Sequence, residues 1–401
     1  MLSMKKYAAF IVLSTIFLSV SFASPYTVGA HDSLDNIIVT SEELESEAFR
    51  LGEYRNSTGV STRVLTVEWI YERYEGVDGP ERIRNCIVDF HLELGIRYVT
   101  IFGDADQVPV RYVYVPDPRG RDALVPTDLY YADLDNGWDS NGDGLFADAK
   151  NDVVDGVPDI YVGRIPTGVE LANSSVDKII GYREGLNVSD PWFNRVLLIS
   201  GDPSGDGSVG TLNGSRLNEY LSQWIELEKV RLYHGQGLTK DSLMENLNLG
   251  YRFVNFAGHG MPGSWLLDSK GSVRFEGPEV EDLMNGHMLP VVTSMACSTA
   301  RFDDGTSISE RLVLEPGGGA IAYIGPTREA WTYAGNSICK GLMGEMNWRI
   351  YEAYSDGYMT LGEIWGVSIS RYVEAHGLGS VFNEKTVMEF ALLGDPTLKI
   401  G

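Results

Sequence analysis

The fold of this chain is decided by two stretches, Arg252-Phe253-Val254-Asn255-Phe256-Ala257-Gly258-His259-Gly260 and Leu289-Pro290-Val291-Val292-Thr293-Ser294-Met295-Ala296-Cys297. Each is a short apolar run rich in β-branched or aromatic residues, which is typical of a buried strand. Each run ends on a reactive side chain, first the imidazole of His259 and then the thiol of Cys297. Ligands bind at the carboxyl ends of the strands in an open parallel sheet, so two such neighbouring strands would bring the imidazole and the thiol together. These two groups are the minimum set for acyl transfer through a thiol.

Strand-like and helix-like segments alternate through most of the 401 residues. This alternation predicts an α/β fold, with a mainly parallel sheet flanked by helices. We expect strands at residues 63–67, 98–102, 160–163, 196–200, 253–257, 291–295 and 320–324. We expect helices at residues 41–56, 80–94, 169–184 and 212–226.

A loop-rich break at residues 116–158 and the turn signal Asp190-Pro191 interrupt this alternation. We therefore expect two α/β subdomains, an N-terminal one over residues 24–190 and a C-terminal one over residues 191–401. Because both reactive residues fall in the second, it is the expected catalytic subdomain.

The charge and the amino terminus indicate where the protein acts. The formal net charge is −24, which argues against binding to nucleic acid or to an anionic membrane. A basic region at residues 4–6, an apolar stretch at residues 8–20 and small residues at Ser21 and Ala23 predict a signal peptide over residues 1–23. An uncleaved amino-terminal anchor is the alternative. We expect a secreted or cell-surface protein that has no membrane association once the signal is removed.

The cysteine count singles out one thiol. Cys86, Cys297 and Cys339 make an odd number, so an exported chain has at least one unpaired cysteine. Cys86 and Cys339 lie in helix-like stretches and are interpreted as core residues. Only Cys297 follows a strand beside small residues, as a nucleophile requires.

An acidic loop carries oxygen ligands at alternate positions. Asp139-x-Asn141-x-Asp143-Gly144 has the one, three, five and glycine-six pattern of a calcium loop, although Lys150 replaces the usual glutamate at position twelve. We expect a structural calcium site, with a solvated acidic turn as the alternative. The candidate ligands are Asp133, Asp135, Asp139, Asn141, Asp143 and Asp148. We expect no redox or nucleotide cofactor.

Several separate motifs carry a family resemblance. They are Gly103-Asp104 with Val108-Pro109, Thr127-Asp128-x-x-Tyr131, Tyr161-Val162-Gly163-Arg164, Gly258-His259-Gly260 with Trp265, Ala296-Cys297, Gly319-Ala320-Ile321-Ala322 with Trp331, and Leu393-Gly394-Asp395-Pro396-Thr397-Leu398. With these motifs in this order, the chain resembles the catalytic domain of the gingipain family of secreted cysteine peptidases. The resemblance extends from about residue 36 to residue 400. The resemblance implies a caspase-like fold.

The resemblance also implies roles for individual residues. Cys297 would be the nucleophile and His259 the general acid–base. The backbone amides of Gly260 and Cys297 would form the oxyanion hole. Asp202 would orient the histidine, at a position where the family can have glutamate. Trp331 would line S1, the pocket for the residue before the scissile bond (P1).

One departure concerns specificity. Gingipains that cut after Arg or Lys have an acidic S1 residue about eleven positions after the orienting carboxylate. This chain has Val209-Gly210-Thr211-Leu212 there, and Asp206 is the nearest acid. The P1 preference therefore stays open.

The expected function is that of a secreted cysteine endopeptidase, which hydrolyses protein or peptide substrates through a Cys-His dyad and a thioester intermediate. One alternative is a catalytically silent, calcium-binding surface or scaffold protein of the same fold. Another is a transpeptidase, because an amine can resolve a thioester in place of water. The sequence leaves the oligomeric state open.

Overall fold

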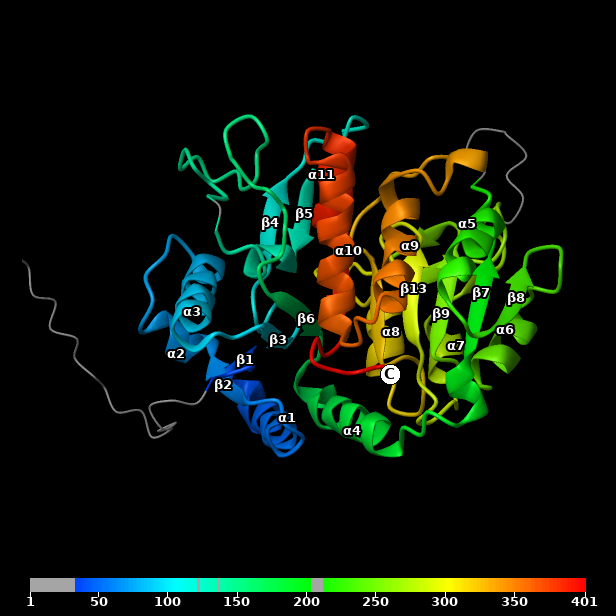
Figure 1. The fold of residues 1–401 in the computed structure, drawn as a ribbon, viewed down its shortest axis with the longest axis horizontal. Coiled ribbons are helices and arrows are strands. Elements are labelled where there is room, and N and C mark those ends of the chain that lie inside the picture. The colour runs from blue at the N-terminus through cyan, green and yellow to red at the C-terminus, as the bar shows by residue number, and fades with distance from the viewer. Residues whose placement is uncertain (1–32, 121–122, 136, 203–211) are drawn as a thin grey trace, which may run out of the picture. The chain divides into compact units, whose positions relative to one another are not determined.

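The computed structural model describes residues 33–120, 123–135, 137–202 and 212–401. The predicted signal peptide, residues 1–23, lies outside the described residues. Ser33–Gly401 form one compact unit, in which one large sheet is flanked by helices (Figure 1). None of the helices in the described ranges combines the length and the apolar character that a membrane span needs.

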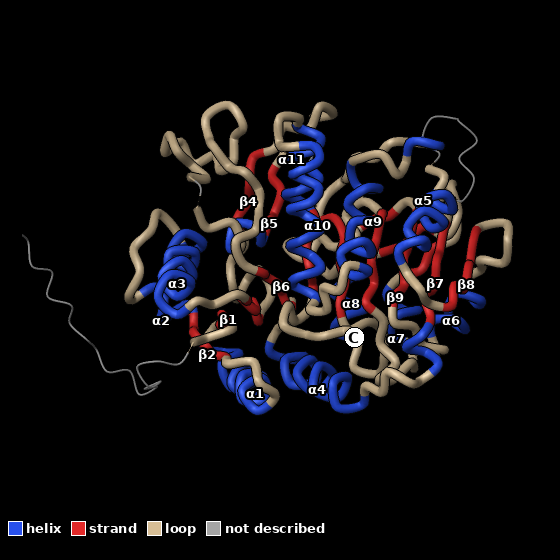
Figure 2. Tube along the Cα trace, viewed as in Figure 1, coloured by secondary structure: helices blue, strands red, loops and turns tan. Residues whose placement is uncertain are grey.

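The sheet has ten strands, and Figure 2 shows them as a layer between helices. In spatial order they are β2 (Thr62–Thr66), β1 (Asn36–Thr40), β3 (Tyr98–Phe102), β6 (Tyr161–Ile165), β15 (Phe390–Leu393), β14 (Ala322–Pro326), β13 (Val291–Met295), β9 (Phe253–Ala257), β7 (Arg195–Ser200) and β8 (Glu228–Tyr233). Among these described strands, only β14 and β15 pair antiparallel. The sheet therefore consists of an N-terminal half-sheet (β2, β1, β3 and β6, with β15 parallel to β6) and a C-terminal half-sheet (β14, β13, β9, β7 and β8) that run in opposite directions.

In the C-terminal half-sheet two hydrophobic cores cover the two faces, which explains why these strands are apolar on both sides. In β13, Val291 belongs to one core with Ile350 of α9, whereas the next residue, Val292, belongs to the other core with Leu312 of α8.

The helices are α1 (Glu45–Ser57), α2 (Val67–Tyr71), α3 (Gly79–Leu94), α4 (Val169–Gly185), α5 (Gly214–Leu221), α6 (Lys240–Leu247), α7 (Gly277–Glu281), α8 (Ile308–Leu314), α9 (Leu342–Ser355), α10 (Leu361–His376) and α11 (Val381–Glu389). Short 3-10 turns are η1 (Glu42–Leu44), η2 (Asp128–Tyr131), η3 (Pro191–Asn194), η4 (Ser222–Trp224) and η5 (Gly335–Ser337).

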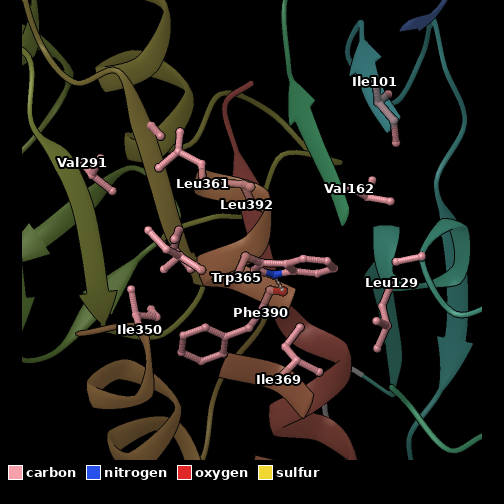
Figure 3. Close-up of a cluster of buried hydrophobic side chains, with 14 of the residues drawn as sticks. Ile101, Leu129, Val162, Val291, Ile350, Leu361, Trp365, Ile369, Phe390 and Leu392 are labelled. Carbon is pink, nitrogen blue, oxygen red and sulfur yellow. Dashed lines mark hydrogen bonds between the residues drawn. The ribbon is translucent and has the colours of Figure 1, made fainter. Parts of the chain in front are cut away.

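The first of these cores joins α10 to the middle of the sheet. Trp365 of α10 lies among apolar side chains from both half-sheets, as Figure 3 shows. Its indole Nε1 donates to the carbonyl oxygen of Phe390, at the start of β15, over 3.0 Å. This contact fixes β15 at the seam between the oppositely directed half-sheets.

Small strand pairs lie outside the large sheet. β4 (Arg111–Tyr114) pairs antiparallel with β5 (Leu124–Thr127). β10 (Gly260–Met261), β11 (Ser264–Leu266) and β12 (Arg274–Phe275) form a three-stranded sheet directly after the catalytic candidate His259.

The mainly parallel α/β architecture that the sequence predicts is confirmed. The expected strands at residues 98–102, 253–257 and 291–295 agree with β3, β9 and β13. The expected helix at residues 212–226 is wrong in extent, because α5 ends at Leu221 and η4 follows it. The expected subdomain boundary near residue 190 falls between α4 and η3 and stays a prediction.

Two motifs behind the family resemblance form buried ion pairs. Arg164 of β6 is fully buried, and its guanidinium contacts the carboxylate of Asp128 at 2.7 Å. The Arg164 guanidinium also donates to the carbonyl oxygens of Gly103 and Val108. Arg55 of α1 pairs with buried Asp395 of the Gly-Asp-Pro motif. These motif residues therefore tie chain segments together inside the fold.

Candidate active site

Three candidate catalytic residues follow three adjacent strands at equivalent positions. Strands β7, β9 and β13 are parallel, and their last residues, Ser200, Ala257 and Met295, are register partners. The three candidates, Asp202, His259 and Cys297, each stand two residues beyond these partners. Because neighbouring strands lie about 4.8 Å apart, this register brings the carboxylate, the imidazole and the thiol to one edge of the C-terminal half-sheet.

The carboxylate of Asp202 faces the imidazole of His259. Nε2 of His259 lies 3.8 Å from Oδ2 of Asp202, a distance that permits a charge interaction but is too long for a hydrogen bond. The Asp202 side chain is buried, and its Oδ2 accepts a hydrogen bond from the Leu212 amide at 2.9 Å. The imidazole is about one-third exposed, so it is accessible from solvent.

Cys297 lies on a turn that is fixed at several points. Ser298 adopts φ +58°, a left-handed conformation that redirects the chain directly after the cysteine. The amide of Ser298 donates to the Arg328 carbonyl oxygen at 2.8 Å, and the amide of Ala300 donates to that of Pro326 at 3.0 Å. The turn is therefore anchored to the end of the neighbouring strand β14.

The thiol of Cys297 is half-buried and lies 3.7 Å from the carbonyl oxygen of Ala330. Its pKa is raised to about 11, first by burial and then by the nearby carboxyl groups of Glu389 and Glu329. The contact with Ala330 and the charge of Arg119 act in the opposite direction. In the resting protein the thiol is therefore protonated at neutral pH, and a proton acceptor must assist its attack.

Gly260 lies directly against the cysteine turn. A β-carbon at this position would be 2.9 Å from the carbonyl oxygen of Cys297 and 2.6 Å from Cγ2 of Thr299. Any side chain would therefore push the histidine loop and the cysteine turn apart, so glycine is required for their close approach.

Trp331 follows Ala330, the residue whose carbonyl oxygen contacts the thiol. Its ring centroid is 4.9 Å from that of Phe382 of α11, and the Arg119 guanidinium lies 4.1 Å from the centroid of Trp331. Trp331 thus follows the residue that contacts the candidate nucleophile, and its place in S1 stays a prediction. The sequence interpretation missed Arg119, Glu329 and Glu389, which belong to none of the motifs.

The stretch in which an acidic S1 residue was sought lies mostly outside the described residues. Asp206 and residues 209–211 belong to the segment 203–211. Leu212 is described, and its amide supports Asp202.

The acidic loop separates into two parts. Carboxylate oxygens of Asp133, Asp135 and Asp159 lie within 4.8 Å of one another. Asp139, Asn141 and Asp143 instead form a turn in which the Asp143 amide donates to Asp139 Oδ1 at 3.0 Å. Asp148 accepts hydrogen bonds from Asn151 and from the Lys150 amide. Within the described residues, Asp133 and Asp135 of the six candidate ligands thus form a carboxylate cluster together with Asp159, and a metal site at Asp139, Asn141, Asp143 and Asp148 stays a prediction.

The sheet of two opposed halves, flanked by helices, defines the class of fold, which is a caspase-like α/β fold. Residues 30–401 match the model of peptidase family C25, the gingipain family, and the chain belongs to this family. Membership of the family supports a cysteine peptidase.

The chain is also similar to one curated protein and to solved structures. An uncharacterized protein of Archaeoglobus fulgidus is 27% identical over 339 residues, covering 73% of this chain and 75% of the relative. The fold is similar to that of the Arg-specific cysteine proteinase gingipain R (RgpB), with 18% identity, a TM-score of 0.70 and coverage of 93% of this chain and 80% of that chain. It is also similar to the complex of Porphyromonas gingivalis RgpB pro- and mature domains, with 19% identity, a TM-score of 0.68 and coverage of 91% and 79%. At these identities the solved structures show the fold.

Proposed function

We propose that this protein is a secreted or cell-surface cysteine endopeptidase that acts on proteins or peptides through Cys297 and His259. The observation that carries the proposal is the equivalent placement of Asp202, His259 and Cys297 after three register-matched strands, in a chain of family C25. A nucleophile, a base and an orienting acid on adjacent strand ends are the parts that covalent acyl transfer needs.

The first half of the reaction forms a thioester. The sulfur of Cys297 attacks the scissile carbonyl carbon, and its proton passes to His259. The tetrahedral intermediate then collapses, the carbon–nitrogen bond breaks, and His259 returns the proton to the departing amine. In the second half, His259 takes a proton from water, hydroxide adds to the thioester carbonyl, and the carbon–sulfur bond breaks to release the acid and restore the thiol.

The amides of Gly260 and Cys297 are the proposed oxyanion hole. Leu266 donates its amide to the His259 carbonyl oxygen at 3.0 Å, and in the antiparallel register Gly260 stands opposite Trp265. Hydrogen-bonded and non-hydrogen-bonded pairs alternate, so the Gly260 amide points away from β11. The close approach of Gly260 to the carbonyl oxygen of Cys297 supports this assignment, because both donors must lie where negative charge develops on the substrate oxygen.

A structural calcium ion is part of the proposal. The three carboxylates of Asp133, Asp135 and Asp159 fit a hard cation, and Asp133 is fully buried. A bound calcium ion would offset two of the three negative charges and would hold Asp133 and Asp135 to Asp159. It has no step in the reaction.

Alkylation of the thiols by iodoacetamide, followed by mass mapping, tests the nucleophile. Below pH 11 we expect the rate at Cys297 to rise about tenfold for each pH unit, because only the thiolate reacts. A peptide acyloxymethyl ketone should label Cys297 and leave Cys86 and Cys339 unmodified as internal controls. Labelling that survives His259→Ala at full rate would contradict the assigned role of the imidazole.

A further inference from the structure

A guanidinium of the chain itself lies on the tryptophan beside the active-site thiol. Arg119 belongs to the loop between β4 and β5, and its guanidinium is 4.1 Å from the ring centroid of Trp331. Nη1 of Arg119 also lies 3.2 Å from the carboxylate of Glu329. Glu329 and Trp331 flank Ala330, whose carbonyl oxygen contacts the Cys297 thiol. Arg119 therefore covers the chain segment next to the reacting sulfur.

Arg119 is held firmly in this position. Its Nε and Nη2 donate to the two oxygens of Asp117, at 3.0 and 2.7 Å. Asp117 in turn accepts from Nζ of Lys385 in α11 at 3.0 Å, and both side chains of this second pair are buried. A bidentate pair of this kind fixes the direction of the guanidinium plane.

The charges around Trp331 are balanced. Arg119 and Lys385 match Asp117 and Glu329, so the four groups carry no net charge. Glu389 is fully buried, and burial raises the pKa of its carboxyl group well above the usual range. Within the part of the chain that the structure describes, a charged side chain that enters here is desolvated and meets the carboxylates of Asp117 and Glu329, which are already paired with cations.

We propose that Arg119 determines specificity: it takes the aromatic and carboxylate contacts beside Cys297 that a basic P1 side chain would use, so that substrates with an uncharged P1 residue are preferred. This inference rests on the proposed function, because it assigns a substrate class to the same site. A basic P1 side chain would need a flat aromatic surface and a carboxylate. Arg119 already occupies both, on Trp331 and Glu329.

The first test compares the P1 profiles of the wild type and Arg119→Ala on one peptide library. We expect the ratio of cleavage after Arg or Lys to cleavage after uncharged residues to rise at least about tenfold in the variant, a change typical of a pocket contact. If the alanine variant folds poorly, the same comparison is made with Arg119→Met, which keeps an apolar stem over Trp331. Arg50→Ala removes an arginine that pairs with Asp177 elsewhere and should leave the profile unchanged. An unchanged profile in folded Arg119→Ala overturns the inference.

A second test needs no turnover and is carried out on the Cys297→Ala protein. Ethylguanidinium, the head group of an arginine side chain, is titrated into the protein in a calorimeter. The double variant Cys297→Ala, Arg119→Ala should bind it, and the triple variant that also carries Trp331→Ala should not. Equal binding with and without Arg119 overturns the inference. If no variant cleaves any peptide, the proposed function fails. Ethylguanidinium binding still shows whether Arg119 occupies a site that a second guanidinium could fill.

Discussion

The two half-sheets have similar strands but different residues at their carboxyl ends. In the C-terminal half-sheet, the positions two residues beyond the matched strand ends are Asp202, His259 and Cys297. In the N-terminal half-sheet, Thr40, Phe102 and Ile165 are the matched ends, and the equivalent positions hold Glu42, Asp104 and Thr167. Each half-sheet brings three side chains together at its carboxyl edge, and of these two described edges only the C-terminal one carries a thiol and an imidazole.

The polar groups of the two halves are also used differently. Arg164, in the N-terminal half-sheet, is fully buried, and its partner Asp128 and two carbonyl oxygens accept its hydrogen bonds. His259 is partly exposed and stands 3.8 Å from its carboxylate. Tight, buried pairing stabilises a structure, whereas a looser, accessible pair leaves the imidazole able to exchange protons. Substitutions in the two halves should therefore separate stability from chemistry.

The largest effect is expected for Cys297→Ala. Turnover should fall on the order of 10⁴-fold or more, because the covalent route is lost. The free energy of unfolding should change by less than about 1 kcal/mol, since one sulfur is removed from a half-buried position. Peptide hydrolysis and urea unfolding measure the two quantities, with Cys339→Ala as the control thiol. Hydrolysis at a wild-type rate would refute the assignment of the nucleophile.

His259→Ala should lower turnover by roughly 10²- to 10⁴-fold, the range of general acid–base catalysis. His234→Ala, which changes an exposed histidine after β8, should have no effect on the same assay. Similar rates for the two variants would mean that His259 is not the catalytic base.

Arg164→Met should act on stability. It leaves Asp128 buried and unpaired, which should cost about 3–5 kcal/mol of unfolding free energy, whereas loss of the exposed Arg50–Asp177 pair should cost no more than about 1 kcal/mol. Urea unfolding of Arg164→Met and Arg50→Met gives the comparison. Equal losses would contradict the structural role of the buried motif.

Asp202→Asn should have a smaller effect on turnover than the loss of His259. A contact of about 1 kcal/mol corresponds to a decrease of roughly five- to tenfold. The decrease should appear in kcat with little change in KM, because Asp202 acts through the imidazole. A loss as large as that of His259→Ala would show that the 3.8 Å contact tightens during the reaction.

Calcium chelation should have the smallest effect. A chelator should lower the melting temperature by roughly 2–4 °C for each kcal/mol of binding free energy that is lost, without changing the rate of the folded enzyme. Asp135→Asn should make the melting temperature insensitive to the chelator. A wild-type melting temperature that does not respond would argue against an ion at Asp133, Asp135 and Asp159.

Much of the catalytic region could be predicted because its signals are local. Apolar runs that end on His259 and Cys297 identify both the strands and the residues beyond them. β15 was not expected, since its four apolar residues directly follow α11 and carry no turn signal. The roles of Arg119, Glu329 and Lys385 could not be predicted from the sequence. Their contacts join segments about 200 residues or more apart, and a local sequence pattern carries no information about such contacts. In the acidic loop, the ligand pattern did not include Asp159, which lies far along the chain from Asp133 and Asp135 and joins their carboxylates only in the fold.

The most direct test of the central claim is digestion of a proteome-derived peptide library by the mature chain, with calcium and a reductant, beside the Cys297→Ala protein. The account predicts cuts that are absent from the Cys297→Ala digest and that leave free carboxyl ends. Identical digests from the two proteins, both folded, would contradict a peptidase that acts through Cys297.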